Sequence, residues 1–148
     1  MSAKKIVVCK ALILAALLAA YVYVVLHNTI LNRAPVFEGV FEIHPMASYR
    51  RAARAPWHLA RLEIRNLILN TAMFMPLGTL VPALYHRLAK FYIALPIALA
   101  ATIAIEIAQF VTARGVFAVE DILHNMAGAA IGYALYKIFW HKLQKRLD

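Results

Sequence analysis

Four long runs of apolar residues, separated by shorter polar stretches, dominate the chain. They extend over residues 6–26, 67–85, 91–111 and 121–140. Each has about the 20 residues that a helix needs to cross the hydrocarbon core of a bilayer. The pattern therefore predicts an all-α fold, a polytopic transmembrane helical bundle of about four spans, formed by a single domain over residues 1–148.

The composition supports a membrane environment. Hydrophobic residues make up 64% of the 148 residues, and the mean hydropathy is +0.69, whereas soluble domains are usually about 45–50% apolar. The formal net charge is +9, but the basic residues flank the apolar runs. That distribution disfavours nucleic acid and indicates contact with anionic lipids. With one cysteine and no metal-ligand spacing among the six histidines, we expect neither a metal nor a cofactor.

Lysine and arginine in the short flanks predict how the bundle is oriented. Both terminal flanks and the turn at residues 86–90 are basic, whereas the short loop after the third run has only Arg114. Because cytoplasmic flanks carry the excess of lysine and arginine, we expect both termini to be cytoplasmic. The first loop, residues 27–65, is long and rich in arginine. Its part from 49 to 65 would be either an interfacial amphipathic helix or a solvated loop.

Polar residues occur near one end of each of the last three apolar runs. In the predicted topology, these ends lie on the side of the membrane opposite the chain termini. The polar residues occur in pairs spaced three or four residues apart, which share one side of a helix. We expect these residues to form a ligand-binding cluster: Asn66, Asn70, Glu106, Gln109, Arg114, Asp121 and Asn125.

Glu106 is the most costly of these residues, because it lies inside the third apolar run. A carboxylate there costs about 3 kcal/mol or more, and intramembrane ionisable groups are functional-site hypotheses by default. A structural alternative is that Glu106 only pairs with Arg114 or Arg65 and holds the bundle together.

Small and helix-bending residues predict how the helices pack. Gly128 and Gly132 continue the side of the helix that carries Asp121, and their spacing allows two membrane helices to approach closely. Pro76 and Gly78 are expected to bend the second spanning helix, which a bundle tolerates. An alternative use of the two later glycines is contact between copies in a homo-oligomer.

The ordered set of motifs resembles the VanZ-like family, named for an accessory protein of glycopeptide resistance. The motifs are Asn-x-x-x-Asn with Phe-x-Pro-Leu-Gly over residues 66–78, Glu-x-x-Gln over 106–109, and Arg…Asp-x-x-x-Asn-x-x-Gly-x-x-x-Gly over 114–132. The family often has Phe-Asp-x-x-Asp after the arginine; here Phe117 and Asp121 match and the first acid is missing, unless Glu120 replaces it. The resemblance implies a small multi-pass protein of the bacterial inner membrane, linked to envelope stress or to susceptibility to teicoplanin.

Two functions remain open for the polar cluster. In the first, it binds a membrane lipid headgroup or a lipid-linked envelope precursor, with arginine contacting phosphate. In the second, the protein is an intramembrane hydrolase or transferase. Glu106 would then be the general acid or base and Asp121 its partner, while Asn70 and Asn125 would stabilise an oxyanion. The chain has no serine or cysteine beside a base that would serve as nucleophile, which favours binding.

Overall fold

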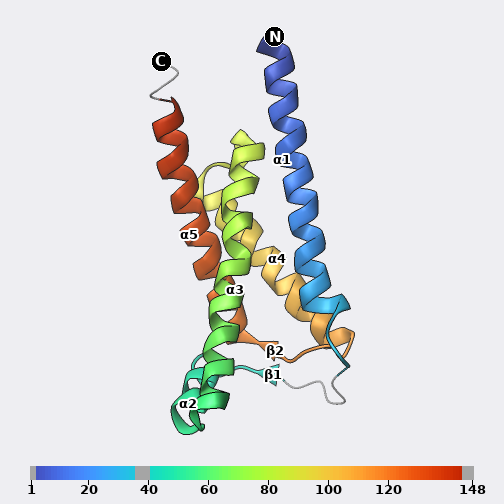
Figure 1. The fold of residues 1–148 in the computed structure, drawn as a ribbon, viewed down its shortest axis with the longest axis vertical. Helices are drawn as coiled ribbons and strands as arrows, with labels where there is room; N and C mark the ends of the chain where they lie inside the picture. Colours follow the sequence, from blue (N-terminus) through green and yellow to red (C-terminus); the bar gives the residue numbers. More distant parts are fainter. Residues whose placement is uncertain (1–2, 36–40, 145–148) are drawn as a thin grey trace.

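A computed structural model describes residues 3–35 and 41–144, and its helices form an elongated bundle (Figure 1). The helices are α1 (Ala3–Leu26), α2 (Ala47–Arg54), α3 (Trp57–Leu84), α4 (Phe91–Val111) and α5 (Val119–Gln144). Shorter elements are a π-helical segment η1 (His27–Leu31), a 3-10 turn η2 (His86–Leu88) and strands β1 (Phe41–Glu42) and β2 (Phe117–Ala118). The predicted all-α fold is confirmed.

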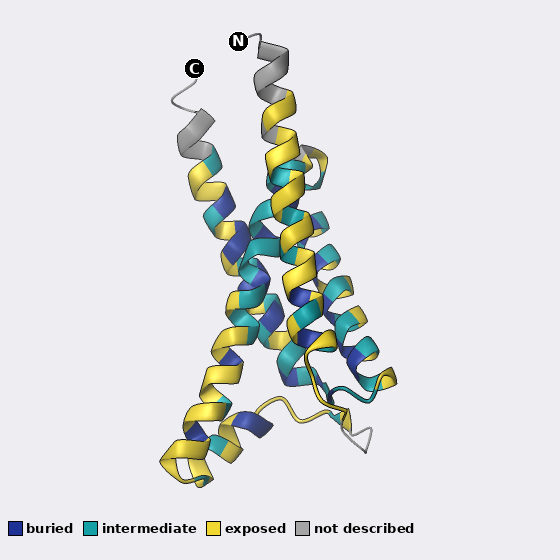
Figure 2. Ribbon diagram, turned by 45° about the vertical axis from the view of Figure 1, so that its right-hand side comes forward, coloured by how far each residue is buried: buried dark blue, intermediate teal, exposed yellow. Residues whose placement is uncertain are grey.

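Three helical stretches in the described part of the chain are long and apolar enough to cross a membrane. They are Ala11–Leu31, which joins α1 to η1, Trp57–Leu84 and Phe91–Val111. Many of their large apolar side chains are exposed, especially along α1 (Figure 2), as expected of helices that contact lipid. Helix α5 is equally long but carries Glu120 and Asp121 in its first turn, so a fourth span remains a prediction.

Of the two alternatives for residues 49–65 in the first loop, the structure has helix. The loop contains α2 and the first turns of α3, which begins at Trp57, ten residues before the apolar run at Leu67. Pro56 starts this helix instead of interrupting it, because its carbonyl oxygen accepts the first bonds, from the Leu59 and Ala60 amides at 2.9 and 3.0 Å. A proline needs no amide donor there, so it fits before the first turn.

Helices α3 and α5 approach through glycine, at backbone contact distance. A Cβ added to Gly128 would lie 2.8 Å from the carbonyl carbon of Thr71, and one added to Gly132 would lie 2.8 Å from that of Met75. Gly78 faces the α5 backbone in the same way. Since α3 of the same chain covers Gly128 and Gly132, this geometry offers no support for the alternative in which they join two copies.

The core is small and lies where α3, α4 and α5 meet. Phe74 of α3, Ala98 of α4 and Ala129 of α5 are its most buried members. The hydroxyl of Thr79 donates to the carbonyl oxygens of Met75 and Gly132, at 3.1 and 3.0 Å. The close glycine contacts thus align α3 and α5, and α4 completes the packing.

The two ends of the bundle differ in structure. The first turns of α1 and the last turns of α5 lie at one end, and η2 turns the chain from α3 to α4 on that side (Figure 1). At the other end lie α2, β1 and β2, together with the link from α4 to α5 (Figure 1). The irregular backbone, and the polar side chains that contact it, are therefore concentrated at the end opposite the termini.

Replacement of Gly128 by leucine should disrupt the α3–α5 contact. The new side chain would overlap the Thr71 backbone, and overpacking costs about 1–3 kcal/mol even where side chains can shift. We expect a lower midpoint of thermal unfolding in detergent micelles. Ala127→Leu, at the exposed neighbouring position, is the matched control, and equal midpoints for the two variants would contradict this packing.

Candidate functional site

A short parallel strand pair closes the end of the bundle opposite the termini. Phe41 pairs with Phe117, and Glu42 pairs with Ala118. The Phe41 ring lies 4.3 Å from the ring of Phe110 and 5.6 Å from that of Phe117, measured between centroids. The pairing ties the long first connection to the link between α4 and α5, segments about 75 residues apart in the sequence.

Glu106 supports this strand pair from within α4. Its side chain is 2% exposed, and its Oε2 accepts a hydrogen bond from the Ala118 amide at 3.0 Å. The carboxylate therefore satisfies a buried backbone donor that would otherwise be unpaired. No ion pair joins Glu106 to Arg114 or Arg65 within the described residues.

Gln109 and Arg114 satisfy the carbonyl groups at the end of η1. The side-chain amide of Gln109 donates to the Thr29 carbonyl at 3.1 Å. The Arg114 guanidinium donates to the carbonyls of Ile30 and Leu31 at 2.8 and 3.0 Å. The last carbonyls of a helix lack intrahelical partners, and a cation there is favourable to the helix dipole.

Asn125 joins α5 to α4 deeper in the bundle. Its side-chain amide donates to the Thr102 hydroxyl at 2.7 Å, and both side chains are almost completely buried. This is an interhelical hydrogen bond between neighbouring helices, of the kind that holds membrane helices together.

A polar cavity of about 630 Å³ opens beside this buried layer. Four residues of the predicted cluster line it: Asn66, Asn70, Arg114 and Asp121. Asn70 of α3 and Asp121 of α5 both line the cavity, so these two helices contribute to the same wall. The other three predicted residues, Glu106, Gln109 and Asn125, are buried behind the wall and are not part of the lining.

Arg33 is a cavity residue that the sequence did not single out. It follows η1, and its guanidinium lies beside Gly115, within electrostatic range of the carboxylates of Glu106 and Asp121. Within residues 3–35 and 41–144, its side chain makes no hydrogen bond or ion pair. Arg33 thus places a guanidinium at the cavity, and no described residue accepts a hydrogen bond from it.

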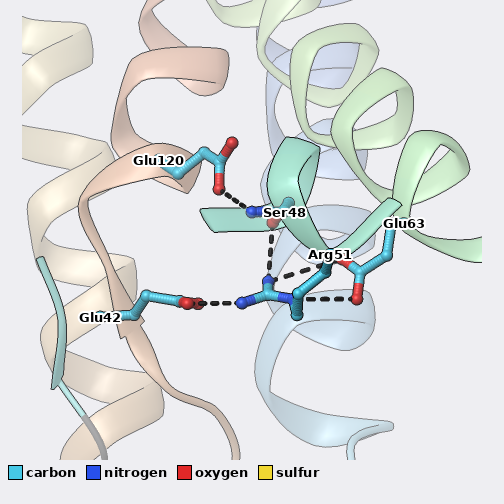
Figure 3. Close-up of polar contacts among 5 residues, drawn as sticks. All are labelled: Glu42, Ser48, Arg51, Glu63 and Glu120. Carbon is cyan, nitrogen blue, oxygen red and sulfur yellow. Dashed lines mark hydrogen bonds and ion pairs between the residues drawn. The ribbon is translucent and has the colours of Figure 1, made fainter. Parts of the chain in front are cut away.

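Arg51 of α2 is engaged in a network at the cavity rim (Figure 3). Its guanidinium pairs with Glu42, pairs with Glu63 at 3.1 Å and donates to the Ser48 hydroxyl at 2.8 Å. Partial burial lowers the pKa of Arg51, but the hydrogen bonds and negative charges of Glu42 and Glu63 outweigh it and raise the pKa above its usual value. Arg51 therefore stays charged and holds β1, α2 and α3 together.

Glu120 anchors the start of α2. It is 1% exposed, and its Oε2 accepts a hydrogen bond from the Ser48 amide at 2.8 Å (Figure 3). This acid lies one residue before Asp121 and two residues after Ala118, which stands where the family pattern has its first acid. The only sequence signal for Glu120 was its nearness to the missing acid of the motif, because the contact with α2 spans 72 residues.

The described residues offer no group of three or more histidine, cysteine, aspartate and glutamate side chains that could hold a metal ion. The site is instead a set of amides, carboxylates and guanidinium groups around a cavity. Such a set recognises a polar or anionic organic group through hydrogen bonds.

Comparison with known families identifies the fold that carries this site. The model of the VanZ/LLP1 family matches residues 9–140. The chain belongs to the VanZ/LLP1 family. The match extends from α1 to α5, so the VanZ/LLP1 region includes the cavity, the strand pair and α2. The resemblance to the VanZ-like family inferred from the motifs is thereby confirmed. No curated protein and no solved structure gave a significant match.

Removal of the Glu106 carboxylate should destabilise the closed end of this VanZ/LLP1 protein. Glu106→Ala leaves the buried Ala118 amide without its acceptor, which costs about 1–3 kcal/mol. We expect lower unfolding free energy in micelles and faster hydrogen exchange at Ala118. Glu106→Gln retains an acceptor oxygen and is the matched control. If both variants exchange at the wild-type rate, the carboxylate does not support the strand.

Glu120→Ala should release α2 from the bundle. The Ser48 amide would lose its acceptor, so α2 would separate and unfold more often. Trypsin would then reach the backbone after Arg50, Arg51 and Arg54, whose side chains are already exposed. We expect faster cleavage after these arginines, followed by mass spectrometry, while Glu120→Gln, which keeps an acceptor, is cleaved like the wild type. Unchanged cleavage of the alanine variant would show that α2 is held by other contacts.

Proposed function

We propose that this protein binds the phosphate-bearing headgroup of an envelope lipid, or of a lipid-linked envelope precursor, in the polar cavity. The observation that carries the proposal is the cavity itself, about 630 Å³ in volume and lined from α2, α3, α5, the connection after α1 and the short link between α4 and α5. Its volume lies within the range of about 300–1,000 Å³ typical of small-molecule sites. Its position at one end of an apolar bundle suits a ligand anchored in the same membrane.

The charges of the lining favour one kind of headgroup. Three arginines and three carboxylates line the cavity, so their formal charges sum to zero: Arg33, Arg51, Arg114, Glu42, Glu63 and Asp121. A polyanion would meet as many negative groups as positive ones. A single phosphate accompanied by hydroxyl or amide groups fits better, because the asparagines and Asp121 hydrogen-bond to such groups.

Arg33 is the residue that we assign to the phosphate. Arg51 is paired with two carboxylates and Arg114 is bonded to two carbonyls, whereas the donors of Arg33 have no partner among the described residues. A guanidinium presents a planar set of donors that matches phosphate geometry. Asn66, which is exposed, and Asn70 then contact the rest of the headgroup.

The buried members of the cluster act indirectly in this proposal. Glu106 positions β2, Gln109 positions η1 and Asn125 joins α4 to α5, so each shapes the wall without contacting the ligand. The enzymatic alternative assigned proton transfer to Glu106. Its absence from the cavity lining and its bond to Ala118 favour binding over catalysis.

The location of the site completes the proposal. We place the protein in the bacterial inner membrane as a multi-pass protein with both termini in the cytoplasm, which family membership and the basic flanks support. The cavity then faces outwards, towards the envelope. Envelope maintenance, or the susceptibility to glycopeptides that the family resemblance implies, would follow from a ligand held at that surface.

Replacement of Arg33 tests this function directly. Arg33→Ala should weaken binding of phosphatidylglycerol to the purified protein about tenfold or more, because a charge-assisted hydrogen bond contributes about 1.5–3 kcal/mol. Binding is measured by native mass spectrometry of the protein released from micelles. Arg61→Ala, on the exposed part of α3, is the matched control for loss of one positive charge.

Two further measurements make the result specific. Asn70→Ala should also weaken binding, since it removes a polar contact from the α3 part of the lining. Phosphatidylcholine, whose headgroup carries no net charge, should bind more weakly than phosphatidylglycerol to the wild type. Equal affinity of wild type, Arg33→Ala and Asn70→Ala for phosphatidylglycerol would overturn the proposal.

A further inference from the structure

A second hollow lies along α3 and adjoins the polar cavity. Its volume is about 310 Å³, and α3 contributes five lining residues: Leu67, Ile68, Thr71, Ala72 and Met75. Leu67 lines both the hollow and the polar cavity. The two spaces are therefore neighbours that lie on different sides of one helix, and we call this second hollow the α3 groove.

The α3 groove is apolar along α3. Ile68 is 61% exposed and Ala72 is also exposed, and both lie in a helix apolar enough to cross a membrane. The Thr71 hydroxyl donates to the Leu67 carbonyl at 3.0 Å, so its hydrogen-bonding capacity is used within the helix. The small side chain of Ala72 leaves the middle of the groove open.

A polar pair from α2 and α5 also lines the α3 groove. The hydroxyl of Tyr49 lies 2.7 Å from Nε2 of His124, and both residues line the groove. Nδ1 of His124 donates to the Glu120 carbonyl at 2.7 Å. Both ring nitrogens are thus engaged. Helix α2 lies at the end of the bundle opposite the termini (Figure 1), and its residues Ser48 and Arg51 line the polar cavity. The Tyr49–His124 pair therefore lies where a ligand would change from polar to apolar.

We propose that the α3 groove holds a hydrocarbon chain of the same molecule whose headgroup occupies the polar cavity. The inference rests on the proposed function and narrows its ligand to an amphiphile, a phospholipid or a lipid-linked phosphate. From Leu67 to Met75 the helix rises about 12 Å, at 1.5 Å per residue, so a long segment of the chain lies against α3. Leu67 then contacts the ligand at the junction between its headgroup and its chain.

The choice of a lipid chain as the occupant follows from the site. The groove is in a membrane-spanning helix, and its apolar α3 wall continues into a cavity that suits an anionic headgroup. A hydrocarbon chain needs no hydrogen-bond partner, which matches the exposed Ile68 and Ala72 and the internally bonded Thr71. One amphiphile can therefore occupy both the polar cavity and the α3 groove, which meet at Leu67.

The test fills the α3 groove and leaves the polar cavity unchanged. Ala72→Trp should lower the affinity for dioleoyl phosphatidylglycerol about tenfold, because displacing two methylene groups from an apolar site has an effect of that size. Ala104→Trp, at an exposed position of α4 outside both spaces, is the control. Glycerol 3-phosphate, which has the headgroup phosphate without hydrocarbon chains, should bind wild type and Ala72→Trp equally.

Photolabelling provides a second readout that does not depend on affinity. Phosphatidylglycerol with a diazirine on one acyl chain should label Ile68, Ala72 or Met75 in the wild type and lose this labelling in Ala72→Trp. Equal labelling of both variants, or labelling spread evenly over all exposed apolar helices, would show non-specific contact with lipid and overturn the inference. A change in oligomeric mass without a change in lipid affinity would make the groove a contact between copies and would also overturn it.

The two proposals fail in different ways. If glycerol 3-phosphate and the lipid both bind the wild type in an Arg33-dependent manner, but Ala72→Trp has no effect on the lipid, the groove inference is wrong and the headgroup site stands. If the binding of glycerol 3-phosphate and the binding of the lipid are both independent of Arg33, the proposed function itself is wrong.

Discussion

Backbone groups in the connections between the helices must find partners at one end of an otherwise apolar bundle, and this requirement organises the structure. An unsatisfied backbone group costs several kcal/mol where water is excluded, so irregular backbone is tolerated only when it is buried in protein or lines a polar cavity. Four side chains from α4, α5 and the link between them meet this need: Glu106, Gln109, Arg114 and Glu120. Each bonds to a backbone group of η1, β2 or α2, so these four polar side chains fix the position of the segments that connect the helices.

This requirement also explains why the polar residues form two layers. The inner layer is buried, bonds to backbone or to Thr102, and shapes the wall. The outer layer lines the cavity and consists of Arg33, Asn66, Asn70 and Asp121. A costly carboxylate such as Glu106 is therefore compatible with a binding site that it does not touch, because it fixes the strand pair beside the cavity.

The glycine contact between α3 and α5 determines which sides of α3 remain available. With Thr71 and Met75 packed against Gly128 and Gly132, the asparagine side of α3 turns to the polar cavity, and the side of Ile68 and Ala72 remains exposed to the surroundings. The result is one helix with a polar and an apolar hollow that meet at Leu67. That arrangement suits a ligand with a polar and an apolar part.

Helical periodicity and apolar length in the sequence alone determined the all-α fold and the approximate positions of three long apolar helices, because these depend on spacing within single helices. The tertiary structure decided which polar residues face the cavity and which support it, since that depends on how η1, β1 and α2 fold across the helix ends. Arg33, Glu42 and Glu63 were not predicted to belong to the site for the same reason. Their partners lie on other elements, and local hydrophobic patterns carry no information about pairings between distant connections. The family motif has its first acid at position 118 and does not mark position 120; only the hydrogen bond from the Ser48 amide of α2 explains why an acid is needed there.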